Sequence, residues 1–274
     1  MTVLNSNLAN AWTPEDYGKL VDITVEAKSV AFQAGTLVPT EMQTVRFPVL
    51  KGDPATGWVA ENATIPLTDP NTDEVVVIPA KVAGRTQVSN EALSDSNPAV
   101  ADQIGKGLAR DIARKVDVAF FGNTVTNGPS GLLSVTHSVI DTGASIANLD
   151  PFHAAKAKAV ENGGELTHFV LAPDVALALA QAKQGTGSNM GLLDNVGDGV
   201  TVAGVPVIVS NAVAAGNAWG LDKEQIMTVR RTGTKVVRSG DAAFAEDATQ
   251  LRATARVGFG FINPAAIVRL YDAA

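Results

Sequence analysis

The clearest hydrophobic pattern in the chain is an apolar residue at every fourth position from residue 100 to residue 120. The series is Val100, Ile104, Leu108, Ile112, Val116 and Phe120. This spacing places the six side chains along one face of a helix. Asn97-Pro98 is typical of a helix start and Gly122 of a helix end, so a helix over residues 97–122 is predicted, roughly 39 Å long. We interpret it as a structural spine.

The segment before this helix is predicted to be extended, after a first helix that begins at Thr13-Pro14 and ends before Gly35. Strand character is found over residues 44–50, 58–60 and 74–88. Residues 51–57 and 65–70 between these strands contain the proline, glycine and aspartate of turns. Two extended arms joined by such turns predict a protruding two-stranded ribbon.

The predicted ribbon carries apolar side chains that need cover, namely Trp58, Val75 and Val77. An isolated two-stranded ribbon is marginal in water. No neighbouring segment offers cover, so we infer that a second copy of the chain supplies it. Glu61, beside Trp58, is either an ordinary exposed acid or a partner for a lysine or arginine of another copy.

The middle of the chain has an α/β pattern that predicts a compact second domain over residues 133–222. Helices are predicted from Asp150-Pro151 to about residue 163 and from Pro173-Asp174 to about Ala182. Strands are predicted over residues 167–171 and, fully buried, over residues 205–209. Residues 185–199 form a glycine-rich loop.

The C-terminal part returns to strand patterns. They cover residues 225–230, 235–238, 251–261 and 265–271, and residues 251–257 alternate apolar and polar side chains. We expect these strands to pair beside the long helix. The first domain would then be assembled from both ends of the chain, which makes the predicted fold class α+β.

Composition points to interfaces and away from specific nucleic-acid binding. Hydrophobic residues make up 46% of the chain and charged residues only 18%, which suits large subunit interfaces. The net charge is −7, and the basic groups Arg110/Arg114/Lys115 and Arg230/Arg231/Lys235 are interpreted as solvated or ion-paired faces. Tight, specific DNA binding is therefore not expected.

Cysteine usage and hydropathy indicate the cellular compartment in which the protein is expected. The chain has no cysteine, which excludes disulfides and thiolate chemistry. The N-terminal residues lack the basic start and apolar core of a signal peptide, and no window is long and apolar enough for a membrane span. A cytoplasm-like compartment without membrane contact is expected.

Catalytic chemistry is not evident in the sequence. His137, His153 and His168 have no second ligand at metal spacing. Residues 185–191 superficially resemble a dinucleotide fingerprint, but the spacing is one residue too long and the segment follows a helix. No catalytic, cofactor-binding or metal-binding residue is assigned. An α/β enzyme with a small ligand around residues 185–199 remains an alternative.

Several short motifs in order resemble the major capsid proteins of tailed bacteriophages. They are Gly57-Trp58-Val59-Ala60-Glu61, Ile65-Pro66, Val88-Ser89 with Glu91 and Leu93, Ala119-Phe120-Phe121-Gly122, Gly128-Pro129 with Gly131-Leu132-Leu133, Arg256-Val257-Gly258 and Pro264-Ala265-Ala266. The resemblance spans nearly the whole chain, and it implies the HK97-like capsid fold first seen in the Hong Kong coliphage.

The resemblance implies a division of the chain into four parts. Residues 1–43 would be the N-terminal arm and helix, and residues 44–82 the extended hairpin called the E-loop. Residues 83–132 and 223–274 would form the P-domain with the spine helix, and residues 133–222 the A-domain. Contacts between subunits are expected at Trp58, Glu61, Val75, Val77, Lys51, Arg110 and Arg114.

The implied function is mechanical. Copies of the subunit would form pentamers and hexamers of an icosahedral or prolate shell around double-stranded DNA. The subunits would contact this DNA non-specifically. A scaffolding protein, a portal and a decoration protein are partners implied by resemblance, as are a place in the virion and assembly in the host cytoplasm. Some relatives crosslink subunits through a lysine, and Lys51 is the candidate here. An encapsulin-like compartment with the same fold is the nearest alternative.

Overall fold

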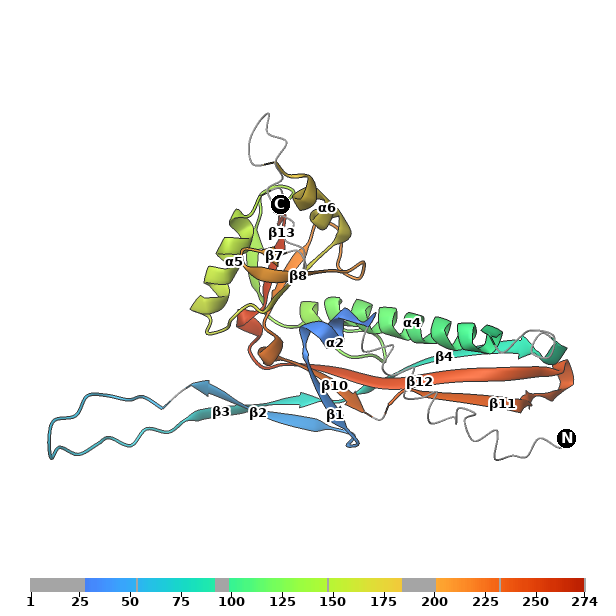
Figure 1. Ribbon diagram of the computed structural model, residues 1–274. Coiled ribbons are helices and arrows are strands. Elements are labelled where there is room, and N and C mark those ends of the chain that lie inside the picture. Colours follow the sequence, from blue (N-terminus) through green and yellow to red (C-terminus); the bar gives the residue numbers. More distant parts are fainter. Residues whose placement is uncertain are drawn as a thin grey trace, which may run out of the picture.

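The computed structural model describes residues 28–52, 54–91, 99–146, 148–183, 201–231 and 233–273. Two β-sheets, one long helix and a projecting two-stranded ribbon form its architecture (Figure 1). Most of the strand pairs are antiparallel, and short helices alternate with strands in the middle of the chain. The predicted α+β class is confirmed.

The first sheet combines strands from both ends of the chain. Its order is β1 (Thr36–Thr40), β10 (Ile226–Arg231), β12 (Ala248–Phe261) and β11 (Lys235–Ala243), and β4 (Ala80–Ser89) also pairs with β12. Strand β12 is 14 residues long and is the common neighbour of β4, β10 and β11. The expectation that C-terminal strands pair with one another beside the long helix is confirmed for these strands.

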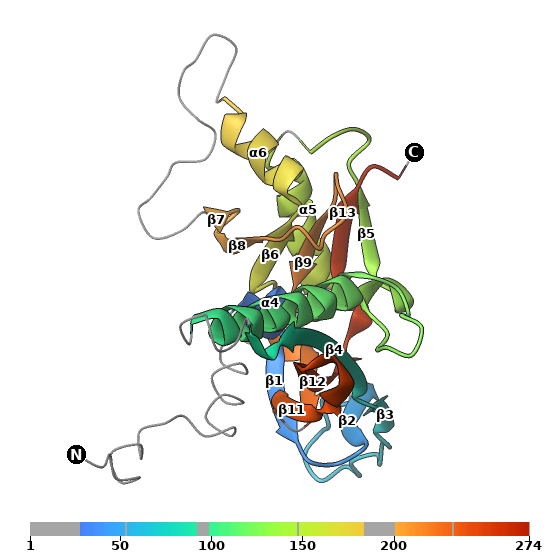
Figure 2. The same cartoon turned by 90° about the vertical axis from the view of Figure 1, so that its right-hand side faces the viewer.

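Helix α4 (Ala99–Phe121) lies along this sheet, between it and the second sheet (Figure 2). The apolar stripe faces inward, since Ile112, Val116 and Phe120 are at most 4% exposed. The helix ends at Phe121, one residue before the predicted end at Gly122, and the predicted start at residue 97 lies outside the described residues. The stripe therefore packs the helix onto the sheet as its period indicated.

The second sheet has six strands and carries two helices. The strand order is β5 (Ser138–Asp141), β13 (Val268–Tyr271), β9 (Ala218–Leu221), β6 (His168–Leu171), β8 (Val205–Val209) and β7 (Thr201–Val202). Helices α5 (Asp150–Glu161) and α6 (Pro173–Gln181) match the predicted helices. Short 3₁₀ turns occur at Leu132–Ser134, Lys223–Gln225, Phe244–Glu246 and Pro264–Ala266. The glycine-rich loop over residues 185–199 lies outside the described residues.

Strand β13 corrects the predicted course of the C-terminal tail. Residues 265–271 were expected among the strands of the first sheet, whereas β13 pairs in parallel with β5 and antiparallel with β9. Val268 and Leu270 are fully buried there. The 3₁₀ turn at Pro264–Ala266 separates β13 from β12. The alternation of apolar residues predicts a strand, but it does not indicate which of the two sheets that strand joins.

Three strand predictions in other segments are also corrected. Residues 74–88 are not one strand: β3 (Asn71–Val77) pairs with β2 (Val45–Gly52), and the break precedes β4 at Ile78-Pro79. Proline has no N–H to donate to a strand ladder, which explains the break. Residues 58–60 form no strand. Strand β8 is buried at Val205 but 52% exposed at Val209, so the prediction of a fully buried strand over residues 205–209 is wrong.

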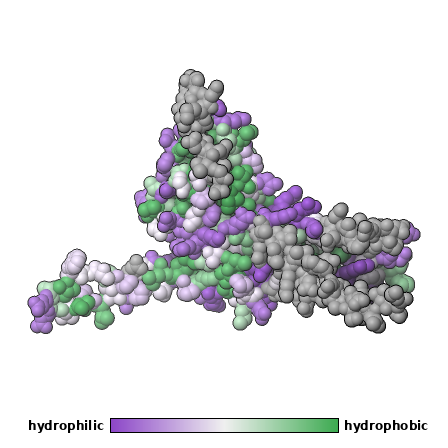
Figure 3. Space-filling view, viewed as in Figure 1, coloured by the Kyte–Doolittle hydropathy of each residue, from purple (hydrophilic) through white to green (hydrophobic). Residues whose placement is uncertain are grey.

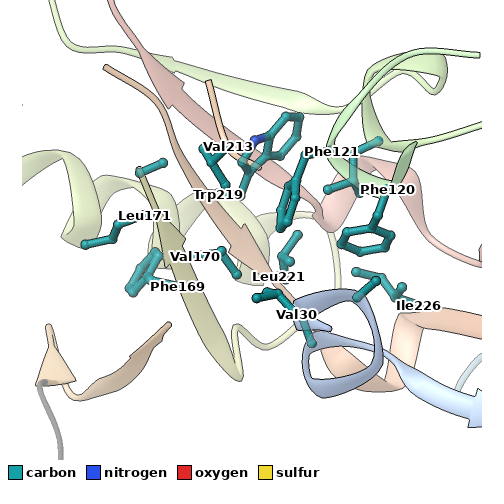
Figure 4. Close-up of a cluster of buried hydrophobic side chains, with 14 of the residues drawn as sticks. Val30, Phe120, Phe121, Phe169, Val170, Leu171, Val213, Trp219, Leu221 and Ile226 are labelled. Atoms are coloured by element: carbon teal, nitrogen blue, oxygen red, sulfur yellow. The ribbon is translucent and has the colours of Figure 1, made fainter. Parts of the chain in front are cut away.

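A continuous hydrophobic core joins the two sheets at the C-terminal end of α4 (Figure 4). Phe120 is fully buried, and its ring centroid lies 5.1 Å from that of Phe259 in an edge-to-face arrangement. Val30, Leu221 and Ile226 complete the junction. Each such burial stabilises the fold by about 1.5–3 kcal/mol. The core holds the long helix and both sheets together as a base for the ribbon.

Helix α2 (Val30–Ala34) is attached to α4 through one buried carboxyl group. The Asp117 Oδ1 atom accepts hydrogen bonds from Ser29 Oγ at 2.6 Å and from the Ala31 N–H at 3.0 Å. Burial raises the pKa of Asp117, and the hydrogen bonds from Ala31, Ser29 and Val30 partly offset this. Helix α2 ends before Gly35 as predicted, but Ser29 has an extended backbone, so the prediction of one continuous helix up to Ala34 is wrong. Residues 13–27 of that predicted helix lie outside the described residues.

The substitution Asp117→Asn is expected to change the pH dependence of stability. A carboxyl group whose pKa is raised on folding stabilises the fold fully below its unfolded pKa and loses this contribution as pH rises through its folded pKa. The free energy of unfolding of the wild type, minus that of the variant, should therefore fall as pH rises above the ordinary value of 3.8 and then level off. Urea unfolding from about pH 4 to about pH 8 measures this difference. A difference that rises with pH contradicts the expectation.

Candidate subunit-contact surfaces

The ribbon is the feature that departs most from the body of the subunit. Strands β2 and β3 pair antiparallel from Val45 opposite Val77 to Gly52 opposite Asn71. Arg46 Nη1 and Glu74 Oε1 form an ion pair across the ribbon at 2.6 Å, and Lys51 pairs with Asp73. The ribbon extends away from the body in the direction opposite to β11 and β12 (Figure 1).

The ribbon tip, residues 54–70, is exposed along its whole length. Trp58 is 107% exposed, Leu67 101% and Ile65 76%. Two hydrogen bonds, from Thr68 Oγ1 to the Ala55 carbonyl and from the Ala63 N–H to the Ala60 carbonyl, lie within the tip. Figure 3 shows hydrophobic side chains gathered there, far from the rest of the subunit. Exposed apolar groups that gather in one place are typical of an interaction surface.

The root of the ribbon corrects part of the sequence interpretation. Val77, expected to be covered by a second copy, is only 2% exposed, and Val75 is half-buried. The cover comes from strand β12 of the same chain. A Cβ built on Gly258 would lie 2.7 Å from Val77 Cγ1, and one on Gly260 would lie 2.7 Å from Val77 Cγ2.

We call Gly258 and Gly260 the glycine seat, because the absence of a side chain at both positions lets β3 lie directly on β12. Sequence reasoning missed it. The signal was present in Val257-Gly258-Phe259-Gly260-Phe261, where glycine occupies every second position of a strand. Glycine within a strand often marks the close approach of another backbone. The seat makes the root part of the subunit and leaves the tip as the exposed surface.

The other predicted contact residues lie in separate places. Glu61 is exposed at the tip near Trp58 in sequence. Lys51 is on the paired part of the ribbon, in its ion pair with Asp73, and its role in a crosslink stays a prediction. Arg110 and Arg114 are exposed on α4, which lies away from the ribbon, so their role as contacts also stays a prediction.

The described residues contain no cluster of histidine, aspartate or glutamate placed to hold a metal ion. His137 Nδ1 is 2.9 Å from the Val135 carbonyl, and His168 Nδ1 is 3.0 Å from Thr167 Oγ1. Burial lowers the pKa of His168, and the charge of Lys223 lowers it further. Within the described ranges, none of the helices has the length and hydropathy of a bilayer-crossing segment.

A projecting ribbon with exposed apolar side chains at its tip, attached to a two-sheet base, is typical of a structural subunit with an interaction surface. The phage capsid family matches residues 13–271, and the chain belongs to this family. The protein is therefore a structural subunit of a phage capsid and not an enzyme. Neither the encapsulin-like compartment nor the small-ligand enzyme is favoured by these findings.

Solved capsid structures have the same fold. The capsid of a native GTA particle superposes with a TM-score of 0.74 at 22% identity, over 92% of this chain and 91% of that one. A structure from Mycobacterium phage Bobi gives a TM-score of 0.73 at 18% identity, over 99% and 94%. One from Microbacterium phage Oxtober96 gives 0.75 at 16%, over 89% and 91%. The expected HK97-like fold is confirmed. A comparison with curated proteins gives no significant match.

Proposed function

We propose that this capsid subunit assembles with copies of itself into pentamers and hexamers, which close into an icosahedral or prolate shell around a double-stranded DNA genome. The observation that carries the proposal is the exposed tip, with Trp58, Ile65 and Leu67 projecting far beyond the body. A contact between one end of a subunit and a different surface of the next is heterologous, and it generates a ring when the rotation closes. The similar GTA capsid was computed with fivefold symmetry, which supports rings of this kind.

The energetics of such a contact suit reversible assembly. Burial of one large apolar side chain of the tip contributes about 1.5–3 kcal/mol, before the cost of ordering the two partners. A single tip therefore binds weakly. Several tips in a ring, each bound to the next subunit, hold the ring together while single contacts can still break and be corrected.

We also propose the division of the chain into four parts that the family resemblance implies. The arm comprises residues 1–43, the E-loop residues 44–82, and the P-domain residues 83–132 with the tail from residue 223. The A-domain comprises residues 133–222, to which the structure adds strand β13. In this arrangement α4 belongs to the P-domain, the ribbon root packs on β12 of the same domain through Val77, and the second sheet meets other copies around an axis.

The subunit belongs to the virion capsid, and assembly in the bacterial cytoplasm is part of the proposal. A scaffolding protein, a portal and a decoration protein are proposed partners by resemblance to the family. The net charge of −7 favours enclosing DNA without binding it tightly, since like charges repel. Contacts to the packaged genome would then be non-specific.

Electron microscopy and size-exclusion chromatography of the purified protein test the proposal. Rings or closed shells, eluting as capsomers or larger particles, are expected. A protein that stays monomeric under all assembly conditions, including the presence of the phage's own scaffolding protein, contradicts it. Nucleic acid extracted from particles made during infection is expected to be the phage genome, whereas a packaged cargo enzyme indicates a compartment.

A further inference from the structure

The exposed side of helix α4 carries a row of basic side chains. Lys106, Arg110 and Arg114 recur every four residues, and Lys115 follows directly. All four are exposed, whereas the apolar stripe of the same helix is turned to the first sheet. Side chains four positions apart are neighbours on a helix surface. We call these four residues the basic row.

Acidic side chains of the helix do little to neutralise the basic row. Asp117 is buried on the side that meets helix α2. Asp111 is the one exposed acid among residues 104–121, and it forms no ion pair with another described residue. Like charges four residues apart destabilise a helix. The row is therefore unfavourable in the isolated subunit and complementary to an anionic partner.

The basic row and the ribbon lie on opposite sides of the first sheet. In β12, Phe259 points to α4, where its ring meets that of Phe120. The glycine seat on either side of Phe259 receives Val77 of the ribbon root from the other face. Successive side chains of a strand alternate between the two faces of a sheet. Figure 2 shows the same arrangement, with α4 on one side of β4 and β12 and with β2 and β3 on the other.

The two sides of the sheet have different roles in the proposed shell. The ribbon joins neighbouring copies, so its side is the side of overlap between subunits, and the exposed side of α4 is left for the opposite surface. Cations also lie on the ribbon side, where Arg85 is opposite Arg252 and Lys81 is opposite Arg256 in the pairing of β4 with β12. These residues provide matched controls, because the enclosed DNA can meet only one of the two sides.

We propose that the basic row is the surface through which the subunit contacts the phosphates of the enclosed double-stranded DNA. The inference rests on the proposed function and names the residues of its non-specific DNA contact. Lysine and arginine contacts to phosphate supply affinity without reading the base sequence. The guanidinium group of an arginine can donate two parallel hydrogen bonds to one phosphate.

The dimensions of the basic row suit such a contact. From Lys106 to Lys115 the row is about 14 Å long, at 1.5 Å per residue. This length corresponds to about four phosphates of one strand, which follow one another every 3.4 Å along the duplex axis. An acidic subunit can thus hold the genome at one row of cations while the rest of its surface repels the DNA.

Duplex binding by the purified subunit tests the proposal. The helix variant is Arg110→Gln/Arg114→Gln, in which glutamine keeps a high helix propensity. Fluorescence anisotropy with a short DNA duplex, between about 20 mM and about 200 mM salt, gives the slope of log affinity against log salt concentration. Each lost phosphate contact lowers this slope by about 0.9, so we expect a reduction of about 1.8 and an affinity about tenfold lower at about 50 mM salt.

The matched control is Arg85→Gln/Arg252→Gln, which removes the same charge from the ribbon side of the same sheet. Its slope and affinity are expected to stay close to those of the wild type. An equal loss in both variants shows that only the overall charge matters, and this result overturns the proposal. A wild type that does not bind the duplex at about 20 mM salt also overturns it.

Crosslinking inside DNA-filled particles locates the contact in the assembled shell. Formaldehyde joins lysine amines to nearby DNA bases, so peptides that contain Lys106 or Lys115 are expected to carry nucleotides in mass spectrometry. The same peptides from empty particles should carry none. Lys81, exposed on the ribbon side, is the matched control. Adducts found chiefly at Lys81 overturn the proposal.

The outcomes separate this inference from the proposed function and from the predicted role of Arg110 and Arg114 as subunit contacts. A helix variant that binds the duplex as the wild type does overturns the inference, and the capsid function stands. If that variant also fails to assemble, the two arginines are subunit contacts. A wild type that forms neither rings nor shells contradicts the proposed function, while loss of duplex binding in the helix variant still supports the basic row as a phosphate contact.

Discussion

Replacement of residues 53–70 by a two-residue Asn-Gly turn is expected to leave the subunit folded and to abolish particle formation. Among the described residues the tip forms hydrogen bonds only within itself, and all its residues are exposed. Its removal therefore takes away no buried contact, and we expect the free energy of unfolding to change by less than about 0.5 kcal/mol. Asn-Gly is the preferred turn for closing two paired strands, and Gly52 and Asn71 already lie opposite each other.

Assembly is expected to fail because the tip supplies the apolar surface that another molecule covers. Urea unfolding and electron microscopy of the same preparation measure the two effects. Trp58→Ala is a milder version, and it is expected to weaken assembly without preventing it. The matched control for the loss of a surface side chain is Val160→Ala. Val160 is an apolar residue on α5 and is 67% exposed. Particles of normal size from the deletion variant contradict the role of the ribbon.

Alanine at the glycine seat is the substitution with the next largest expected effect. In Gly258→Ala the new Cβ would lie 2.7 Å from Val77 Cγ1 and 3.2 Å from the Pro79 Cα. Valine is stiff at χ1 and the proline atom belongs to the backbone, so the strand itself has to move. Overpacking of this kind costs about 1–3 kcal/mol. The direction of the ribbon changes with it, and assembly is expected to decline in parallel.

The seat offers its own controls. Gly240→Ala in β11 places a Cβ with no heavy atom within 4 Å, so it is expected to be nearly neutral. At Gly260 the closest contacts are the side chains of Val77 and Val75, so Gly260→Ala combined with Val77→Ala should relieve most of the overlap. Val77→Ala combined with Gly258→Ala should relieve the overlap only in part, because the contact of the new Cβ with the Pro79 backbone remains. A Gly258→Ala variant as stable as the wild type, with normal particles, refutes the importance of the seat.

Much of the local structure could be predicted because it depends on neighbours in the sequence. The four-residue apolar period of α4 and its end at Gly122 required only the geometry of one helix. The alternation of helix and strand around α5 and β6 could be predicted in the same way, from local sequence patterns. The ribbon was also predicted, because Val45 to Val77 contains two extended arms around a proline-rich middle.

The contacts between distant segments could not be predicted in the same way. The cover of Val77 by Gly258 and the place of β13 in the second sheet both depend on which strands pair. The pairing of Arg85 with Arg252 depends in addition on the register of β4 against β12, which a shift of one residue would change completely.

The sequence by itself determined most of the helices and strands and the apolar character of the projecting ribbon, because these follow from periodicity and turn chemistry over short stretches. Only the tertiary structure decided where the root of the ribbon is held, in which direction the tip points and which charges meet on the sheet. These properties come from packing between residues far apart in the chain, where one glycine or one register position selects among arrangements that the local sequence leaves equivalent.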